Sequence, residues 1–345
     1  MISPPLLELV RCPACHGRLS GAASSLTCAS CGRRYESSAS DYLDLRPAES
    51  FAERTKYLDE SLHADARYER VSPPLLGSKI RNDMLRAYLS PSPDDLVVDL
   101  GCGSGRALLW NRDWGARTVG VDISPFFAQE ARRDVDLLLG DLRRLPFGDG
   151  TFTKAYSLDV LEHLSPEALR AVLAEAARVI APGGLLFVYT HVRKNAPIAA
   201  GLRWINALAR RLERIGLIDM RQERLRKSDH LNPLADIPEL RRVAADAGFR
   251  IAKIRYYTPL VGGFVENILM RMGERWLARR ASGAAGALSP EDALKAARAA
   301  GKDRVAASPT TRAVLRMLTT AMKLDLALFG RVESGPFFAL LERTR

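Results

Sequence analysis

The sequence lacks any run of about 18 consecutive apolar residues, the minimum for a helix that crosses a bilayer, so no transmembrane helix is predicted. The first residues, Met1-Ile2-Ser3-Pro4-Pro5, also lack the basic stretch and apolar stretch of a secretory signal peptide. Cysteine is scarce: there are five in 345 residues, four of them in two close pairs, which is a poor disulfide framework. These absences predict a cytoplasmic protein.

The composition is that of a folded protein, with 47% hydrophobic and 26% charged residues. At roughly 150 residues per domain, the length favours about two units. The formal net charge is +11. Such a charge is compatible with binding to nucleic acid, anionic lipid or a phosphorylated substrate, and equally with an Arg-rich composition that has no such partner.

The paired cysteines predict a metal site near the N-terminus. Cys12, Cys15, Cys28 and Cys31 form two C-x-x-C knuckles separated by a hairpin-length spacer, the pattern of a structural zinc ribbon. Four thiolates leave no open position on Zn²⁺, and a segment this short needs the metal to fold. A thiol redox pair is the rival interpretation, but the surrounding strand–helix pattern is missing. The stretch 28–47 resembles the end of a Trm112-like ribbon, with Ala39-Ser40 where that family usually has glycine.

A glycine loop follows a short apolar run farther along the chain. Residues 95–99 predict a buried parallel strand, and residues 106–110 begin a helical pattern. Gly101, Gly103 and Gly105 lie between them and allow the backbone to approach a ligand at the helix N-terminus. Alone, this loop indicates only a nucleotide site.

Acidic residues at three successive strand ends make the prediction more specific. Asp99 ends the first strand, Asp122 ends a second at 118–122, and Asp141 follows a third at 135–139. Asp122 stands where a ribose-binding carboxylate is expected. With Asp159-Val-Leu-Glu-His-Leu164 and Ala181-Pro-Gly-Gly184, the region 79–257 resembles a class I methyltransferase that uses S-adenosylmethionine (SAM).

The resemblance implies a role for each matching residue. Asp99 and the loop would hold the methionine part of SAM, Asp122 the ribose hydroxyls and Asp141 the adenine amine. Ile123 and Leu142 would cover the adenine, while Ser157 and Leu158 would face the sulfonium. The implied cofactor residues are Asp99, Gly101, Cys102, Gly103, Gly105, Asp122, Ile123, Asp141, Leu142, Ser157 and Leu158. The fourth strand departs from the family by beginning Phe152-Thr153-Lys154 instead of Phe-Asp.

The methyl acceptor is less well defined by the sequence. The motif Asn/Asp-Pro-Pro-Tyr/Phe is missing after the fourth strand, and so is a Pro-Cys nucleophile, which argues against two nucleobase chemistries. Glu162 and His163 are candidates for acid–base catalysis, because histidine titrates near neutral pH. His163 has a structural alternative as the cap of a helix beginning at Ser165. Further candidates for the base are Tyr189, His191 and His230.

Two insertions account for the positive charge. Residues 193–230 contain ten Lys/Arg against four Asp/Glu, and residues 258–330 contain eleven against six. Apolar stripes predict amphipathic helices at 201–215, 265–280 and 310–329, with an Ala/Gly-rich, partly mobile helical linker at 281–308. A helical lid over the acceptor, contact with a lipophilic acceptor or an anionic membrane surface, and nucleic-acid binding all remain open.

The sequence therefore predicts an α/β protein with a Rossmann-like, seven-stranded methyltransferase sheet and helical cap insertions behind a small zinc ribbon. The expected units are a ribbon at 1–47, a helical linker at 48–92 and a methyltransferase domain at 93–345. We expect methyl transfer to a small or lipophilic acceptor, neutral or anionic, in the cytoplasm or at the inner face of the membrane. An rRNA or tRNA base methyltransferase and a non-catalytic SAM-fold binding protein are the alternatives. The oligomeric state is not predicted.

Overall fold

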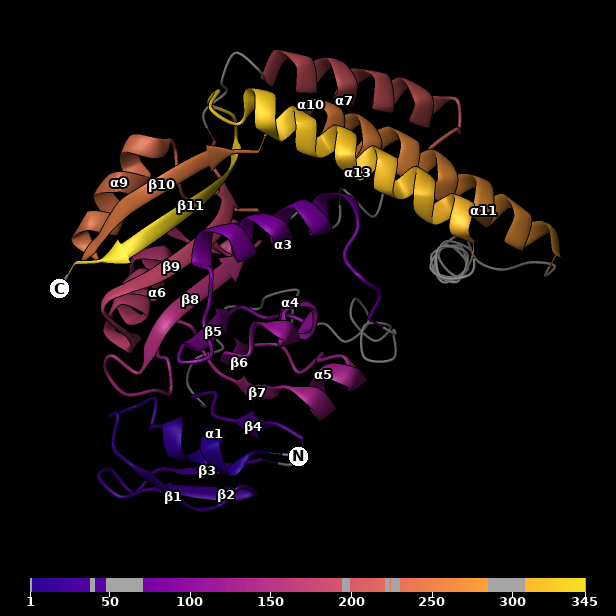
Figure 1. The fold of residues 1–345 in the computed structure, drawn as a ribbon. Helices are drawn as coiled ribbons and strands as arrows, with labels where there is room; N and C mark the ends of the chain where they lie inside the picture. The colour runs from indigo at the N-terminus through magenta and orange to yellow at the C-terminus, as the bar shows by residue number, and fades with distance from the viewer. Residues whose placement is uncertain are drawn as a thin grey trace.

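The computed structural model describes residues 2–37, 41–47, 71–193, 199–220, 224, 230–257, 259–284 and 308–344. In Figure 1 the N-terminal ribbon lies below a central sheet, and a group of long helices lies above it. The ribbon contains helix α1 (Pro4–Leu9) and an antiparallel sheet of β1 (Leu19–Ala22), β2 (Ser25–Cys28) and β3 (Arg34–Glu36). Ser3 caps α1 by accepting a hydrogen bond from the Leu6 amide, and Pro4 suits the first helical turn.

The central sheet confirms the Rossmann-like prediction. Its strand order is β10-β11-β9-β8-β5-β6-β7-β4, and β5 to β9 run parallel. The strands are β5 (Leu96–Leu100), β6 (Arg117–Asp122), β7 (Asp136–Leu139), β8 (Phe152–Leu158), β9 (Ile180–His191), β10 (Phe249–Tyr256) and β11 (Pro336–Arg343). The inner strands are nearly continuous apolar runs because helices cover both faces of the sheet.

Helices connect these strands and have recognisable starts. They are α3 (Leu76–Leu89), α4 (Arg106–Trp110), α5 (Gln129–Asp134), α6 (Pro166–Val179) and α9 (Ile237–Asp246), with 3₁₀ turns η3 (Arg112–Trp114) and η4 (Leu161–His163). Ser165 caps α6 by accepting a hydrogen bond from the Ala168 amide, and Asp236 caps α9 in the same way. The cap of α6 is thus Ser165 and not His163.

The sheet has one strand more than predicted. The short β4 (Leu43–Asp44) pairs in parallel with β7, so that Leu43 lies opposite Leu138. Leu43 and Leu45 are fully buried. The segment assigned to the ribbon therefore completes the edge of the larger sheet and covers its exposed hydrogen-bonding groups. Two residues are too few to show strand periodicity, which is why the sequence did not reveal β4.

The ribbon shares its core with the sheet. Val10 forms an isolated antiparallel bridge with Phe147, and the Arg11 amide donates to the Pro146 carbonyl at 2.8 Å. Phe147 packs edge-on against Phe152 at the start of β8. Apolar side chains of the ribbon and of the sheet belong to one continuous buried cluster. The ribbon and the sheet are therefore held together by packing of their apolar side chains as well as by the covalent connection between them.

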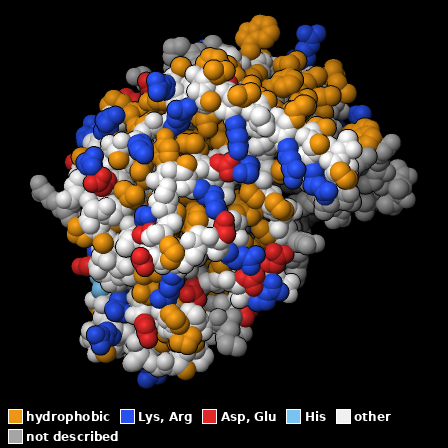
Figure 2. Space-filling model, viewed as in Figure 1, with side chains coloured by type: hydrophobic (Ala, Val, Ile, Leu, Met, Phe, Trp, Pro, Cys, Tyr) orange, Lys and Arg blue, Asp and Glu red, His pale blue; other side chains and the backbone are white. Residues whose placement is uncertain are grey.

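The insertions form the predicted helical cap. It consists of α7 (Ala199–Arg214), α10 (Pro259–Phe264), a π-helical turn (Val265–Leu269), α11 (Met270–Ala284) and α13 (Pro309–Phe329). Figure 1 shows α13 above α3, and the Leu76 amide donates to Thr319 Oγ1 at 3.1 Å. Figure 2 shows apolar side chains gathered over these helices. Most of the predicted 281–308 linker and residues 48–70 lie outside the described residues.

The last strand begins later than predicted, at Pro336 instead of Val332. Ser334 is buried, and its hydroxyl donates to the Tyr257 carbonyl at 3.0 Å, which turns the chain into the sheet. β11 then pairs antiparallel with β9 and with β10.

Candidate functional site

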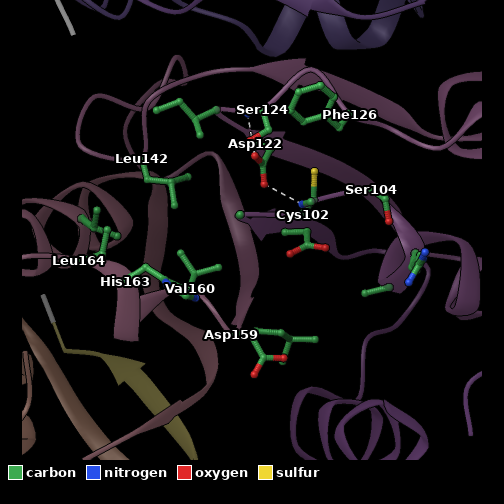
Figure 3. Close-up of a pocket in the computed structure, with 18 of the residues that line it drawn as sticks. Cys102, Ser104, Asp122, Ser124, Phe126, Leu142, Asp159, Val160, His163 and Leu164 are labelled. Atoms are coloured by element: carbon green, nitrogen blue, oxygen red, sulfur yellow. Dashed lines mark hydrogen bonds between the residues drawn. The ribbon is translucent and has the colours of Figure 1, made fainter. Parts of the chain in front are cut away.

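A cavity of about 630 Å³ opens at the carboxyl ends of β5, β6 and β8. Ligands of open α/β sheets bind in this position, and the volume is that of a small-molecule site. The candidate cofactor residues that line it are Asp99, Gly101, Cys102, Gly103, Asp122, Ile123, Asp141, Leu142 and Leu158. Figure 3 shows Asp122 and Leu142 on one side of this cavity and Asp159 on another.

The glycine loop needs glycine for two reasons. Gly101, Gly103 and Gly105 all have positive φ, of 85°, 54° and 80°, which side-chain-bearing residues rarely adopt. A Cβ on Gly101 would lie 2.4 Å from Val160 Cγ2, and one on Gly105 would lie 2.7 Å from Ala131 Cβ. The loop is therefore fixed by packing on both sides before α4 begins.

Asp122 is held in place by the backbone. The Gly103 amide donates to its Oδ2 at 2.7 Å, and the Ser124 amide donates to its Oδ1 at 2.8 Å. Each carboxylate oxygen keeps a further lone pair for a ligand. Burial raises the pKa of Asp122, and these amide hydrogen bonds oppose that rise. The carboxylate is thus oriented before any ligand arrives.

Asp99 and Cys102 are more deeply buried members of the cavity wall. Burial raises the pKa of both the Asp99 carboxyl and the Cys102 thiol well above their ordinary values. A neutral thiol is a poor nucleophile. Cys102 is therefore a lining residue of the loop and not a reactive group.

Asp141 lines the cavity but already has a cationic partner. Arg143 Nη2 lies 2.8 Å from Asp141 Oδ2, and the Arg143 amide donates to Oδ1 at 2.9 Å. Arg143 lines the same cavity. An adenine amine at Asp141 would therefore share the carboxylate with this guanidinium, an arrangement that the sequence did not predict.

Two predicted cofactor residues do not line the cavity. Ser157 is buried, and its hydroxyl donates to the Leu100 carbonyl at 2.8 Å beneath the loop. Gly105 lies behind Ser104 and Arg106, which do reach the cavity. Both residues support the loop. Ser157 points away from the cavity because alternate residues of a strand face opposite sides of the sheet, and Gly105 is hidden by the turn of the loop.

The acceptor-side candidates gather at the end of β8 and β9. His163 lines the cavity, whereas Glu162 is 1% exposed and lies behind it. His191 Nδ1 lies 3.4 Å from Glu162 Oε1, and the ring centroids of His163 and His230 are 4.6 Å apart. Burial opposes ionisation of Glu162, but His191 and His163 outweigh it and lower the pKa of Glu162. Tyr189 is buried beside His191, with its ring centroid 5.6 Å away.

Helix α3 contributes residues that the sequence did not indicate. Ser78, Arg81 and Asn82 line the cavity. Arg81 Nε lies 3.4 Å from Asp159 Oδ2, and its guanidinium lies 5.3 Å from the centroid of the Tyr189 ring. No motif marks this helix, so only the fold brings it to the site. Leu231, another lining residue, is similarly distant in sequence.

The zinc-ribbon cysteines meet as predicted. Cys12 Sγ lies 3.7 Å from Cys31 Sγ, and Cys15 Sγ lies 3.5 Å from Cys28 Sγ. All five cysteines of the chain are free thiols. A tetrahedral Zn²⁺ site with Zn–S bonds of about 2.3 Å has S···S edges of about 3.8 Å, so the four thiols fit this ion. His16 is exposed and is not part of the four-cysteine group.

The unusual start of the fourth strand has a local explanation. Lys154 Nζ lies 2.7 Å from Asp95 Oδ2, and Thr153 Oγ1 donates to Asp95 Oδ1 at 2.7 Å. An acid at the start of β5 thus replaces the usual acid on β8. The SAM-side loop at the opposite end of these strands is unaffected.

Comparisons with known proteins agree with this architecture. Residues 98–188 match the family model "Methyltransferase domain", and residues 3–36 match "Trm112p-like protein". A probable tRNA methyltransferase 9B of Mus musculus is 34% identical over 134 residues, which cover 38% of this chain and 30% of that protein. A demethylmenaquinone methyltransferase of Corynebacterium kroppenstedtii is 40% identical over 104 residues, covering 30% of this chain and 44% of that one. The chain thus spans less than half of either relative.

A solved structure shows the same fold over most of the chain. It is phosphoethanolamine N-methyltransferase 2 of Haemonchus contortus in complex with S-adenosyl-L-methionine, with a TM-score of 0.52 and 15% identity, covering 86% of this chain and 59% of that one. Together with the sheet order and the four cysteines, these matches show that the chain carries a methyltransferase domain with an N-terminal Trm112-like zinc ribbon.

Proposed function

We propose that the protein transfers a methyl group from SAM to a small or lipophilic acceptor. The observation that carries this proposal is that Asp99, Asp122 and Asp141, from three adjacent strand ends, all line the cavity beside the glycine loop. In the proposal, Asp122 binds the ribose and the loop holds the methionine part. Leu158 and His163 mark the side where the sulfonium meets the acceptor.

The lining favours a small acceptor over a folded nucleic acid. Apolar side chains, Leu164, Val172 and Leu231, form the wall near His163, and helix α3 closes the opposite side. Methyl transfer is an in-line displacement, so alignment of the donor and a small acceptor in this cavity supplies much of the rate. The group Glu162, His163 and His191 remains the candidate for activating the acceptor.

SAM binding tests the first part of this proposal. Calorimetry on the full chain should detect SAM binding, and Asp122→Ala should weaken it about 10- to 100-fold, since a hydrogen bond to a charged group is worth about 1.5–3 kcal/mol. Asp94→Ala removes an exposed acid at the other end of β5 and should leave the affinity unchanged. A folded protein that does not bind SAM would support the non-catalytic alternative instead.

The surface of the cap suggests where a lipophilic acceptor comes from. Every exposed large apolar side chain in the described part of the chain lies between residues 204 and 332. Trp204 on α7 is 82% exposed, and Leu328 on α13 is 74% exposed. Figure 2 shows these apolar side chains over the cap, with Lys and Arg side chains around them. Isolated exposed apolar residues are common, but such a concentration marks an interaction surface.

We infer that this cap surface lies against an anionic membrane. Exposed arginines accompany the apolar residues on α7, among them Arg203, Arg210, Arg211 and Arg214. An apolar face with a basic rim is the pattern of helices that lie in a lipid interface. RNA would be expected to select basic residues without large exposed aliphatic side chains. None of the described helices is long and apolar enough to cross a bilayer.

Binding to lipid vesicles distinguishes an anionic membrane from RNA as the partner of the cap surface. The protein should sediment with vesicles containing anionic phosphatidylglycerol more strongly than with pure phosphatidylcholine vesicles. Trp204→Ser and Arg211→Glu should each reduce sedimentation with the anionic vesicles several-fold. Arg170→Glu, the same charge change on α6, should have little effect. Equal binding by all variants, or tight salt-sensitive binding and methylation of rRNA fragments, would refute the membrane assignment.

A further inference from the structure

We propose that Glu162, His163 and His230 form a second metal site, which binds a divalent transition-metal ion at the acceptor end of the cavity. One ligand atom from each of these three residues lies within 4.8 Å of the other two. Two imidazoles and one carboxylate are a common ligand set for Zn²⁺, Co²⁺, Mn²⁺ or Fe²⁺. The site is separate from the zinc ribbon, whose four cysteines form a group of their own.

The backbone brings these residues together from distant parts of the sequence. Glu162 and His163 are consecutive in η4, directly after β8. The loop that follows the first insertion returns to them, because the Asn232 amide donates to the Glu162 carbonyl at 2.8 Å. Asn232 adopts a positive φ of 44°, which is uncommon for a residue other than glycine. This return places the His230 ring edge-on against the His163 ring.

The carboxylate is oriented in the way that a metal ligand requires. Thr190 Oγ1 donates to Glu162 Oε2 at 3.0 Å, while Glu162 Oε1 faces His191 Nδ1 at 3.4 Å. Glu162 is 1% exposed, so its negative charge needs a cationic partner. His191 is not one of the three ligands, and its buried Nδ1 faces this carboxylate without a hydrogen bond within the described residues.

An ion here would have an open coordination position. Three protein ligands leave a fourth site for water or substrate, and His163 places the ion at the cavity wall beside Leu164 and Leu231. An acceptor oxygen bound to the ion would lose its proton more readily. This role rests on the proposed methyl transfer, whereas metal binding itself does not. The ion would then replace His163 as the group that activates the acceptor.

Metal counting after exposure to Co²⁺ tests the site. The full chain is incubated with Co²⁺ alone and desalted, and zinc plus cobalt are then measured by mass spectrometry. We expect two metal ions per chain in the wild type and one in His230→Ala. His16→Ala changes an exposed histidine outside the cluster and should keep both ions.

Thr190 provides a second test that keeps all three ligands. Thr190→Val should weaken Co²⁺ binding about 10- to 100-fold, because partners of a metal ligand contribute that much to affinity. Thr190→Ser retains the hydroxyl and should bind Co²⁺ like the wild type. A chain that retains one ion in its wild-type form, or two ions when both His163 and His230 are alanine, would overturn the proposal. SAM calorimetry on the same samples reports separately on the proposed function.

Discussion

At the residue scale, the site depends on carboxylates whose surroundings differ. Asp122 accepts hydrogen bonds from two backbone amides and stays oriented toward the cavity. Asp141 shares its charge with Arg143, and Asp99 is buried below the loop. Aspartate at three strand ends therefore serves three purposes. Asp122 is a positioned hydrogen-bond acceptor, Asp141 is one half of an ion pair, and Asp99 supports the loop from a buried position.

Asp95 leads to a prediction about pH. Burial raises the pKa of Asp95, but hydrogen bonds from Lys154, Ser92 and Thr153 outweigh it and hold the pKa below its ordinary value. The stability that it contributes is therefore complete above the unfolded pKa of about 3.9 and is lost as the pH falls through the lower folded pKa. Asp95→Asn should lower the free energy of unfolding by about 1–3 kcal/mol at neutral pH.

Urea denaturation at several pH values measures this effect. The difference between wild type and Asp95→Asn should shrink as the pH falls below about 4, where the carboxyl of the unfolded chain takes up a proton while that of the folded chain is still ionised. A difference that stays constant down to about pH 2 would contradict the linkage to Asp95. Asp94→Asn is the matched control, because Asp94 is next to Asp95 in the sequence and its own carboxyl is exposed.

At the scale of elements, β4 joins the ribbon to the methyltransferase sheet. Leu43 is fully buried opposite Leu138 of β7. Strand β7 in turn pairs with β6, which ends at Asp122. Leu43→Ala should therefore lower the free energy of unfolding by about 2–5 kcal/mol, as expected for a cavity in a packed core. Guanidinium denaturation checks this value. Leu19→Ala, on the half-exposed strand β1, should cost much less, and equal losses would refute a special role for β4.

At the scale of the whole molecule, the ribbon and the sheet share one apolar cluster. Loss of zinc should therefore destabilise the whole chain and not the ribbon alone. Cys12→Ser should remove the ribbon ion and lower the midpoint of thermal unfolding of the whole chain, because a loss of 1 kcal/mol lowers it by about 2–4 °C in domains of about 150–250 residues. Scanning calorimetry should show one transition, and Cys102→Ser should keep the ribbon zinc. A separate ribbon transition with an unchanged main transition would contradict this prediction.

The sequence by itself determined the features that depend on neighbouring residues. The C-x-x-C knuckles, the glycine loop, the acidic strand ends and the amphipathic helices are local patterns, because each follows from spacing along the chain. Glu162 and His163 could likewise be named as candidates from their position after the fourth strand.

The tertiary structure alone decided which residues meet. It added β4 to the sheet, brought α3 to the cavity and placed His230 against His163. It also turned Ser157 toward the loop backbone and paired Asp141 with Arg143. Such contacts join segments as far apart in the sequence as Leu43 and Leu138, or depend on which face of a strand is buried. Local spacing along the sequence does not predict these contacts, because packing between whole helices and strands determines them.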